Sequence, residues 1–131
     1  MYLLDSNICI YIINNRPRQV VDHIKKLKVH TVKLSAISLA ELEYGVSKSK
    51  AREKNRQALI DFATPFDIID FNDEDAEVFG IIRADLEKRG LVIGPYDMQI
   101  AAQAITRNLT LVTNNTSEFA RIPNIKLENW V

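Results

Sequence analysis

The segment Tyr2-Leu3-Leu4-Asp5-Ser6-Asn7 predicts a short buried strand that ends in a polar turn. Its apolar residues suit the centre of a sheet, where strands are covered on both faces. Ser6 and Asn7 supply cap chemistry for a helix over Ile8 to Asn14. Asp5 is harder to explain, because a charge at the end of a central strand needs a partner. It is therefore a candidate functional residue, with helix capping as the alternative.

Beyond this segment, short β-like runs alternate with longer helical patterns. Further strands are predicted over Val32 to Ile37, Phe66 to Phe71, Thr110 to Thr113 and Ile125 to Trp130. Helices are predicted near residues 17–27, 39–46, 51–63, 73–89 and 95–108. Strands separated by helices imply an α/β fold in which a parallel sheet of four to five strands carries helices on both faces.

Length, charge and cysteine content indicate a single domain that has no internal disulfide and no overall charge. The chain has 131 residues, which fits one domain over residues 1–131, and its formal net charge is zero. Neutrality gives no global attraction to nucleic acid, although it leaves room for a small site that binds phosphate. Cys9 is the only cysteine, so no internal disulfide forms. We find no apolar run long enough for a membrane span and no signal peptide, and expect a cytoplasmic location.

Two further acids occupy positions like that of Asp5. Glu41 follows the apolar run from Ser35 to Ala40, and Asp97 lies just inside a helix that begins at Gly94-Pro95. Carboxylates at the ends of parallel strands converge in one crevice. Three carboxylates without a compensating His or Cys set favour a hard cation such as Mg²⁺ or Mn²⁺. A metal ion held in this way suits phosphodiester hydrolysis.

Each of these acids also has a purely structural interpretation. Ser38 and Glu41 fit the S-x-x-E capping box, and Asp97 falls in a first helical turn, where an acid favours the helix dipole. Taken together, three such coincidences are less probable than one shared site. Ser6 and Asn7 can orient carboxylates or waters around such a site.

The basic residues Arg83 and Lys48 to Arg56 each allow two interpretations, one functional and one structural. Arg83 lies amid apolar positions of its helix, so it either points inward toward the acids or snorkels at the surface. The cluster Lys48 to Arg56 either faces phosphates or is an ordinary solvated helix surface.

Several segments together resemble the VapC toxins of bacterial toxin–antitoxin pairs, which are PIN-domain nucleases. The opening Asp5-Ser6-Asn7 is similar to the D-[ST]-N start of PIN domains. The resemblance continues, in order and at suitable spacing over essentially the whole chain, through Ser38–Gly45, Ile93–Ala102, Leu111–Phe119, Arg121–Pro123 and Leu127–Trp130.

The resemblance implies a three-layer α/β/α PIN-like domain and a Mg²⁺- or Mn²⁺-dependent endoribonuclease. It implies that a VapB-type antitoxin silences the enzyme and that a homodimer forms. Several VapC relatives cut tRNA in the anticodon stem-loop, which makes tRNA a candidate substrate. Asp5, Glu41 and Asp97 match the catalytic acids of the family. Asn115 stands where many PIN domains carry a fourth acid, and Glu118, the nearest carboxylate, is the candidate for that late acidic function.

Other functions fit the sequence less well. A phospho-acceptor domain would have adjacent acids after the first strand, and a haloacid-dehalogenase-type phosphatase would have D-x-D where Asn7 replaces the second Asp. A PIN-like scaffold without catalytic activity remains the alternative. Retention of all three acids argues against it.

Overall fold

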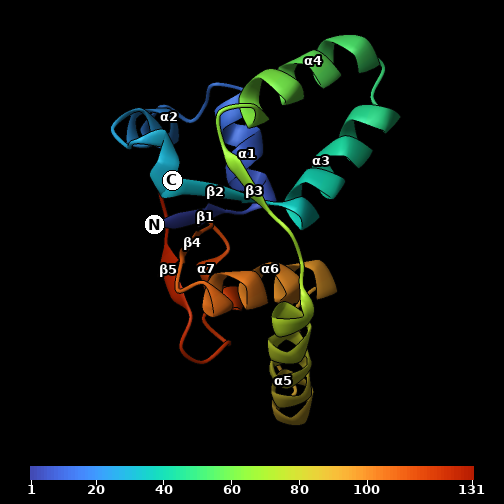
Figure 1. Cartoon of the computed structure of the whole chain (residues 1–131), viewed down its shortest axis with the longest axis vertical. Coiled ribbons are helices and arrows are strands. Elements are labelled where there is room, and N and C mark those ends of the chain that lie inside the picture. Colours follow the sequence, from blue (N-terminus) through green and yellow to red (C-terminus); the bar gives the residue numbers. More distant parts are fainter.

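The computed structural model describes residues 1–131 and contains one five-stranded parallel sheet with the order β3-β2-β1-β4-β5. The strands are β1 (Tyr2–Leu4), β2 (Val32–Ser35), β3 (Asp67–Ile69), β4 (Thr110–Val112) and β5 (Lys126–Glu128). The α-helices are α1 (Ser6–Ile13), α2 (Arg18–Lys25), α3 (Ala36–Lys48), α4 (Arg52–Ala63), α5 (Asp73–Arg89), α6 (Pro95–Thr106) and α7 (Thr116–Phe119), and a short 3₁₀ helix covers Val29–Thr31. The predicted three-layer α/β/α fold is confirmed (Figure 1).

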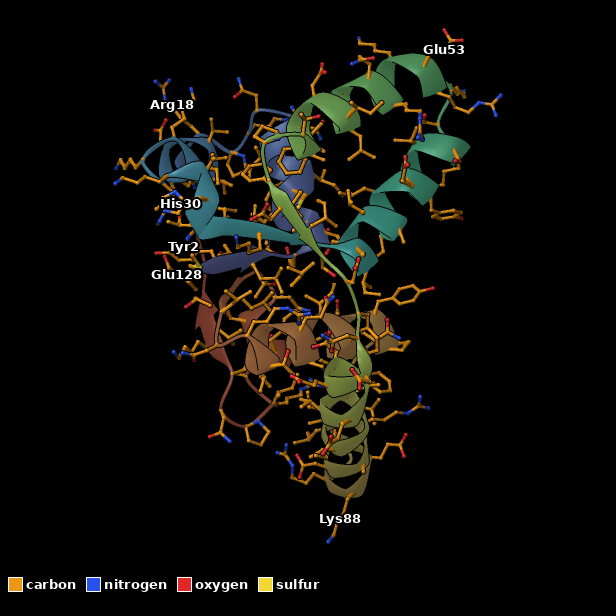
Figure 2. The ribbon with its side chains drawn as sticks, viewed as in Figure 1. Tyr2, Arg18, His30, Glu53, Lys88 and Glu128 are labelled. Carbon is orange, nitrogen blue, oxygen red and sulfur yellow. The ribbon has the colours of Figure 1, made fainter.

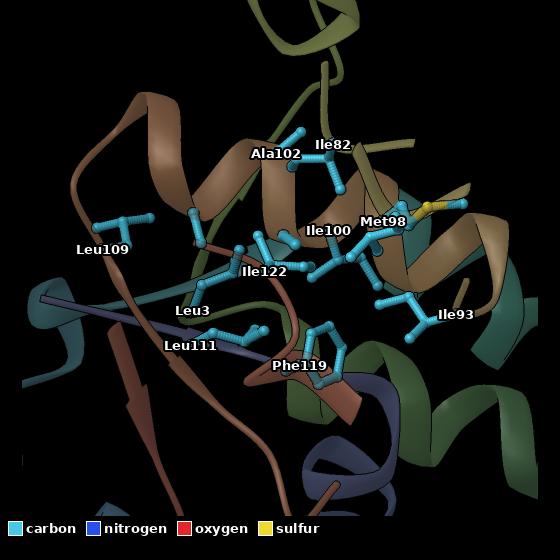
Figure 3. Close-up of a cluster of buried hydrophobic side chains, with 13 residues drawn as sticks. Leu3, Ile82, Ile93, Met98, Ile100, Ala102, Leu109, Leu111, Phe119 and Ile122 are labelled. Atoms are coloured by element: carbon cyan, nitrogen blue, oxygen red, sulfur yellow. The ribbon is translucent and has the colours of Figure 1, made fainter. Parts of the chain in front are cut away.

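The first strand lies at the centre of the sheet, as its apolar sequence predicts. β1 pairs with β2 on one side and with β4 on the other. Because side chains alternate along a strand, Leu3 and Leu4 enter opposite layers. Leu3 packs with Leu111 in a core under α5, α6 and α7 (Figure 3), and Leu4 packs with Val112 in a second core under α1 to α4. The sheet thus divides the interior into two apolar layers.

The helices project from the sheet in two directions. α3 and α4 form a pair on one side, and α5 extends away on the other. Glu53 near the start of α4 and Lys88 near the end of α5 consequently mark opposite ends of the molecule (Figure 2). The region between these two projections is where α3 and α6 approach each other, and the candidate site lies there.

The boundary between the second strand and its helix differs from the sequence prediction. β2 ends at Ser35, and α3 already begins at Ala36. The Ser35 hydroxyl accepts a hydrogen bond from the Ile37 N–H at 3.0 Å and so caps the helix. The capping box proposed for Ser38 and Glu41 is therefore wrong, because Ser38 lies inside the helix. Glu41 is then free of a capping role.

No helix of this structure combines the length and the apolar composition that crossing a membrane requires.

Candidate active site

Four acidic side chains from different parts of the chain influence one another electrostatically. Asp5 joins β1 to α1, Glu41 lies on α3, Asp97 lies in the first turn of α6, and Glu118 lies on α7. Burial raises the pKa of Asp97 to about 6, and the charges of Glu41, Asp5 and Glu118 contribute in that order. The structure thus brings together the three predicted acids and the late acid Glu118.

Asp5 is both a helix cap and a member of this acidic cluster. The residue is only 6% exposed, and its carboxylate accepts a hydrogen bond from the Ile8 N–H at 2.9 Å, which makes it the N-cap of α1. Burial raises the pKa of Asp5, while hydrogen bonds from Thr113 and Ile8 oppose this shift. Glu41 raises it further. The capping interpretation is therefore correct, and it does not remove Asp5 from the site.

Glu41 is held toward Asp5 by a neighbour of that residue. The Ser6 hydroxyl donates a hydrogen bond to Glu41 Oε1 at 2.8 Å. Ser6 is the first residue of α1, so this contact links the start of α1 to the second turn of α3. The expectation that Ser6 orients a carboxylate is met by this bond, although the site role of the pair remains a proposal.

Glu118 is oriented by the residue that stands in place of the expected acid. The Asn115 side-chain amide donates a hydrogen bond to Glu118 Oε2 at 2.9 Å. The Asn115 N–H in turn donates to the Thr113 hydroxyl at 2.9 Å. Asn115 therefore cannot replace the missing charge, but it directs the nearby carboxylate of Glu118.

No basic side chain neutralises the acidic cluster. The ion pairs of the protein all involve acids outside this cluster, namely Asp22, Glu43, Asp67, Asp75, Asp85, Glu87 and Glu128. Burial raises the pKa of the nearby Cys9 thiol, which stays protonated and is a poor ligand or nucleophile. The cluster therefore offers only oxygen donors with surplus negative charge, the chemistry that hard divalent cations prefer.

The carboxylates are gathered but do not yet form a closed coordination shell. No three carboxylate, histidine or cysteine side chains stand at the spacing of a preformed metal site. Three of these carboxylates accept hydrogen bonds from neutral donors instead: Asp5 from the Ile8 N–H, Glu41 from the Ser6 hydroxyl and Glu118 from the Asn115 side-chain amide. A cation that binds these carboxylates would therefore have to compete with these neutral donors.

Of the remaining predicted site residues, Arg83 lies elsewhere and Asn7 contacts the acids only through its backbone. The inward orientation considered for Arg83 is wrong: its side chain is 54% exposed and forms an i,i+4 ion pair with Glu87 at 2.9 Å. Asn7 is exposed and its side chain forms no hydrogen bond within the protein, but its backbone hydrogen bond to Asp5 opposes the rise in the pKa of that carboxyl. In the basic cluster, Arg56 pairs with Glu43, and the Lys48 ammonium lies 4.8 Å from the centre of the Tyr44 ring.

Sequence reasoning missed two polar residues, Thr113 and Gln103, that connect the elements carrying the acids. Thr113 follows β4 beside Asp5, since the Asp5 N–H donates to the Val112 carbonyl at 3.0 Å. Gln103, fully buried on α6, accepts a hydrogen bond from the Ser35 hydroxyl. Its amide donates to the Asp70 carbonyl at 3.1 Å.

Gln103 connects the helix that carries Asp97 to the N-cap of the helix that carries Glu41. A polar residue among the alanines of α6 was the available signal. Its partners, however, lie 33 residues or more away in the sequence, so the chain alone does not reveal them.

Comparison with known proteins places this geometry in a family context. Residues 2–125 match the family model of the PIN domain. The chain is 49% identical to "Ribonuclease VapC2" of Rickettsia felis, over 99% of this chain and 98% of that protein. It is 40% identical to "tRNA(fMet)-specific endonuclease VapC" of Salmonella typhimurium, over 98% and 97% of the two chains.

Solved structures agree with these matches. The crystal structure of VapBC2 from Rickettsia felis, bound to a DNA fragment from its promoter, superposes with a TM-score of 0.93 at 48% identity. The superposition covers 99% of this chain and 98% of the Rickettsia felis chain. DNA-bound VapBC from Salmonella typhimurium also gives a TM-score of 0.93, at 38% identity and the same coverage.

Proposed function

Since this chain belongs to the PIN-domain family and, within it, to the VapC ribonucleases, we propose that it is a metal-dependent endoribonuclease of a toxin–antitoxin pair. The observation that carries the proposal is the cluster of Asp5, Glu41, Asp97 and Glu118 without a balancing cation, because surplus charge of this kind is what a metal ion relieves. The proposed reaction is hydrolysis of RNA phosphodiester bonds.

The cation that we propose is Mg²⁺, with Mn²⁺ as a substitute. Both ions take oxygen ligands, and Mg²⁺ is commonly bound through one or two carboxylates together with substrate phosphates. Asp5 and Asp97 are the proposed direct ligands, and Glu41 and Glu118 complete the site directly or through water. A bound divalent ion lowers the pKa of a ligated water and stabilises charge on the phosphate.

The residues of this chain prepare the site for that chemistry. Ser6 holds Glu41 and Asn115 holds Glu118 at the sides of the cluster, which restricts the rotation of both carboxylates. Asp97, whose pKa is about 6, is largely ionised at neutral pH and ready to bind a cation. No side chain has to act as the nucleophile, because water takes that role in metal-assisted hydrolysis.

A direct assay tests the proposed function. The purified chain is incubated with end-labelled RNA in Mg²⁺, in Mn²⁺ and in EDTA. We expect cleavage fragments with either metal ion and none with the chelator, and addition of excess Mg²⁺ should restore cleavage. Intact RNA under every condition would favour the alternative of a PIN-like scaffold without activity. Cleavage that persists in EDTA would exclude the metal-dependent mechanism.

A protein partner follows from the same relatives, whose crystal structures are described as VapBC complexes. We propose that a VapB-type antitoxin binds the cleft of about 280 Å³ between α1, α3 and α4, which Ile13, Leu42 and Val46 line and which Glu41 borders. An amphipathic segment suits such an apolar groove. Failure of this chain to bind the product of the neighbouring reading frame would contradict the pairing.

The proposal extends to the identity of the RNA substrate and to the oligomeric state of the protein. One relative is named as specific for tRNA(fMet), so we propose tRNA as the first RNA to test. We also propose a homodimer, in accord with the family resemblance, and light scattering that shows a stable monomer would contradict it. A cytoplasmic location accords with an RNA substrate.

The late acidic function is expected to belong to Glu118. Glu118→Gln removes a charge that acts on Asp97, so we expect weaker Mg²⁺ dependence and cleavage reduced by about 10- to 100-fold, the usual range for outer-shell groups at metal sites. Asn115→Ala only frees the Glu118 side chain and should reduce cleavage less. Cleavage rates over a Mg²⁺ titration compare the two variants. If Asn115→Ala is impaired while Glu118→Gln cleaves like the parent, the role belongs to Asn115.

A further inference from the structure

A second hollow borders the acidic cluster, on the side of α3 that faces α6. Its volume is about 480 Å³, and it is lined by Ile37, Ala40, Glu41 and Tyr44 of α3 and by Tyr96 of α6. The spacing of residues 37, 40 and 44 places their side chains on one stripe of the helix. Glu41 forms part of the wall, and Tyr96 directly precedes Asp97. A ligand in this hollow would therefore lie beside the carboxylates.

Two aromatic rings stand open at this hollow. Tyr44 is 66% exposed and Tyr96 is 56% exposed, although aromatic side chains normally bury most of their surface. The two rings do not pair with each other; the aromatic pairs of the protein lie elsewhere. Ile37 and the small Ala40 complete the apolar lining of the hollow. Apart from the Lys48 ammonium, which lies over the Tyr44 ring at 4.8 Å from its centre, both rings are open to a flat, partly apolar ligand.

We propose that Tyr44 and Tyr96 bind an unpaired RNA base next to the phosphodiester bond that is cleaved, an inference that rests on the proposed ribonuclease function. Any of the four RNA bases can stack on an aromatic ring, and each stacked base adds substantially to the free energy of binding. The Lys48 ammonium, 4.8 Å from the centre of the Tyr44 ring, supplies positive charge for a neighbouring phosphate. Acidic walls alone would repel RNA, so these two rings and Lys48 provide the attraction that the carboxylates lack.

A base-binding site made of Tyr44 and Tyr96 distinguishes single-stranded RNA from duplex RNA. In a duplex, both faces of each base are covered by neighbouring bases, so no face is free for Tyr44 or Tyr96. Entry into the hollow would first require the base to leave the stack, which costs free energy. The chain should therefore bind single-stranded segments and loops in preference to continuous duplex.

The test measures stacking independently of catalysis. In an Asp97→Asn background, which keeps the RNA intact, we titrate protein into a short single-stranded RNA that carries a fluorescent adenine analogue quenched by stacking. We expect quenching on binding. Tyr44→Ala and Tyr96→Ala should each weaken binding by about 5- to 150-fold, which corresponds to ~1–3 kcal/mol per stacked base. Tyr44→Phe keeps the ring and should retain the affinity of its parent.

Matched controls separate this inference from its rivals. Ile60→Ala removes a comparably exposed apolar side chain from α4, away from the hollow, and should leave binding unchanged. Equal affinity of the two Tyr→Ala variants and their parent would overturn the inference, even if the wild-type chain cleaves RNA. Light scattering that shows loss of a dimer in Tyr44→Ala would also overturn it, because the rings would then serve a second copy of the chain. Absence of cleavage by the wild-type chain in Mg²⁺ would instead refute the proposed function itself.

Discussion

We expect Asp97→Asn to reduce RNA cleavage by about 100- to 1,000-fold, as the loss of one strong electrostatic contact in an active site usually does. The substitution keeps the shape of the side chain and its place in the first turn of α6, and removes only the charge. A neutral amide is a weaker ligand for Mg²⁺ than a carboxylate. Cleavage of labelled RNA at saturating Mg²⁺ measures the effect, and full activity would refute the role of Asp97 as a ligand.

The same variant should be more stable than its parent when EDTA removes divalent ions. In the folded protein the pKa of Asp97 is raised to about 6 from 3.8, so ionisation of Asp97 opposes folding at neutral pH. A difference of about two units corresponds to ~3 kcal/mol, which solvent screening of this partly exposed group reduces to ~1 kcal/mol. The parent recovers this stability as the pH falls from about 6 to 3.8, so the advantage of the variant should disappear there.

Thermal unfolding across this pH range provides the measurement. A variant that is less stable than the parent at neutral pH would show that Asp97 serves the helix dipole rather than a metal site. Lower cleavage together with higher stability in Asp97→Asn would therefore show that the Asp97 carboxylate destabilises the fold and serves catalysis.

Substitutions of Asp5 should separate its two roles. Asp5→Asn keeps an oxygen that can accept the Ile8 N–H, and Asn caps helices about as well as Asp. We therefore expect cleavage to fall by about 100-fold or more, as for other charge-bearing groups in active sites, with no loss of melting temperature. Asp5→Ala should lose the same activity and, in addition, about 1 kcal/mol of stability from the missing cap.

The comparison of these two variants is decisive for Asp5. Their cleavage rates should be similarly low, while their melting temperatures should differ. If Asp5→Asn cleaves RNA like the parent, Asp5 is a helix cap and nothing more.

The sequence predicted those elements whose signals are local and dense. α5 was predicted with its observed bounds, because Asp73 to Arg89 has helical periodicity throughout and Gly90 ends it with a φ of 68°. β1 was equally clear as a short apolar run. The boundary between β2 and α3 was misplaced, because the apolar run from Ser35 to Ala40 suits either a strand or a buried helix, and only the cap at Ser35 decides between them.

Of the residues at the candidate site, the sequence alone predicts only the charged ones. Asp5, Glu41 and Asp97 carry signals of their own, since each is an acid near the end or start of an apolar element. Gln103 acts through partners on β2 and after β3, and such distant partners leave no local pattern. Arg83 was misjudged for a similar reason: an arginine among apolar residues points outward when an acid four residues later offers a solvent-exposed partner.

The strand order has a consequence for the way the protein is made. β1 is synthesised first yet lies between β2 and β4, and β4 spans only Thr110–Val112. One edge of β1 therefore stays unpaired on the ribosome until the segment from β4 onward has emerged. Glu118 emerges later still. A nascent chain that is unfinished at that point lacks both the completed sheet and the full set of carboxylates, so we expect the toxin to be harmless during its own translation.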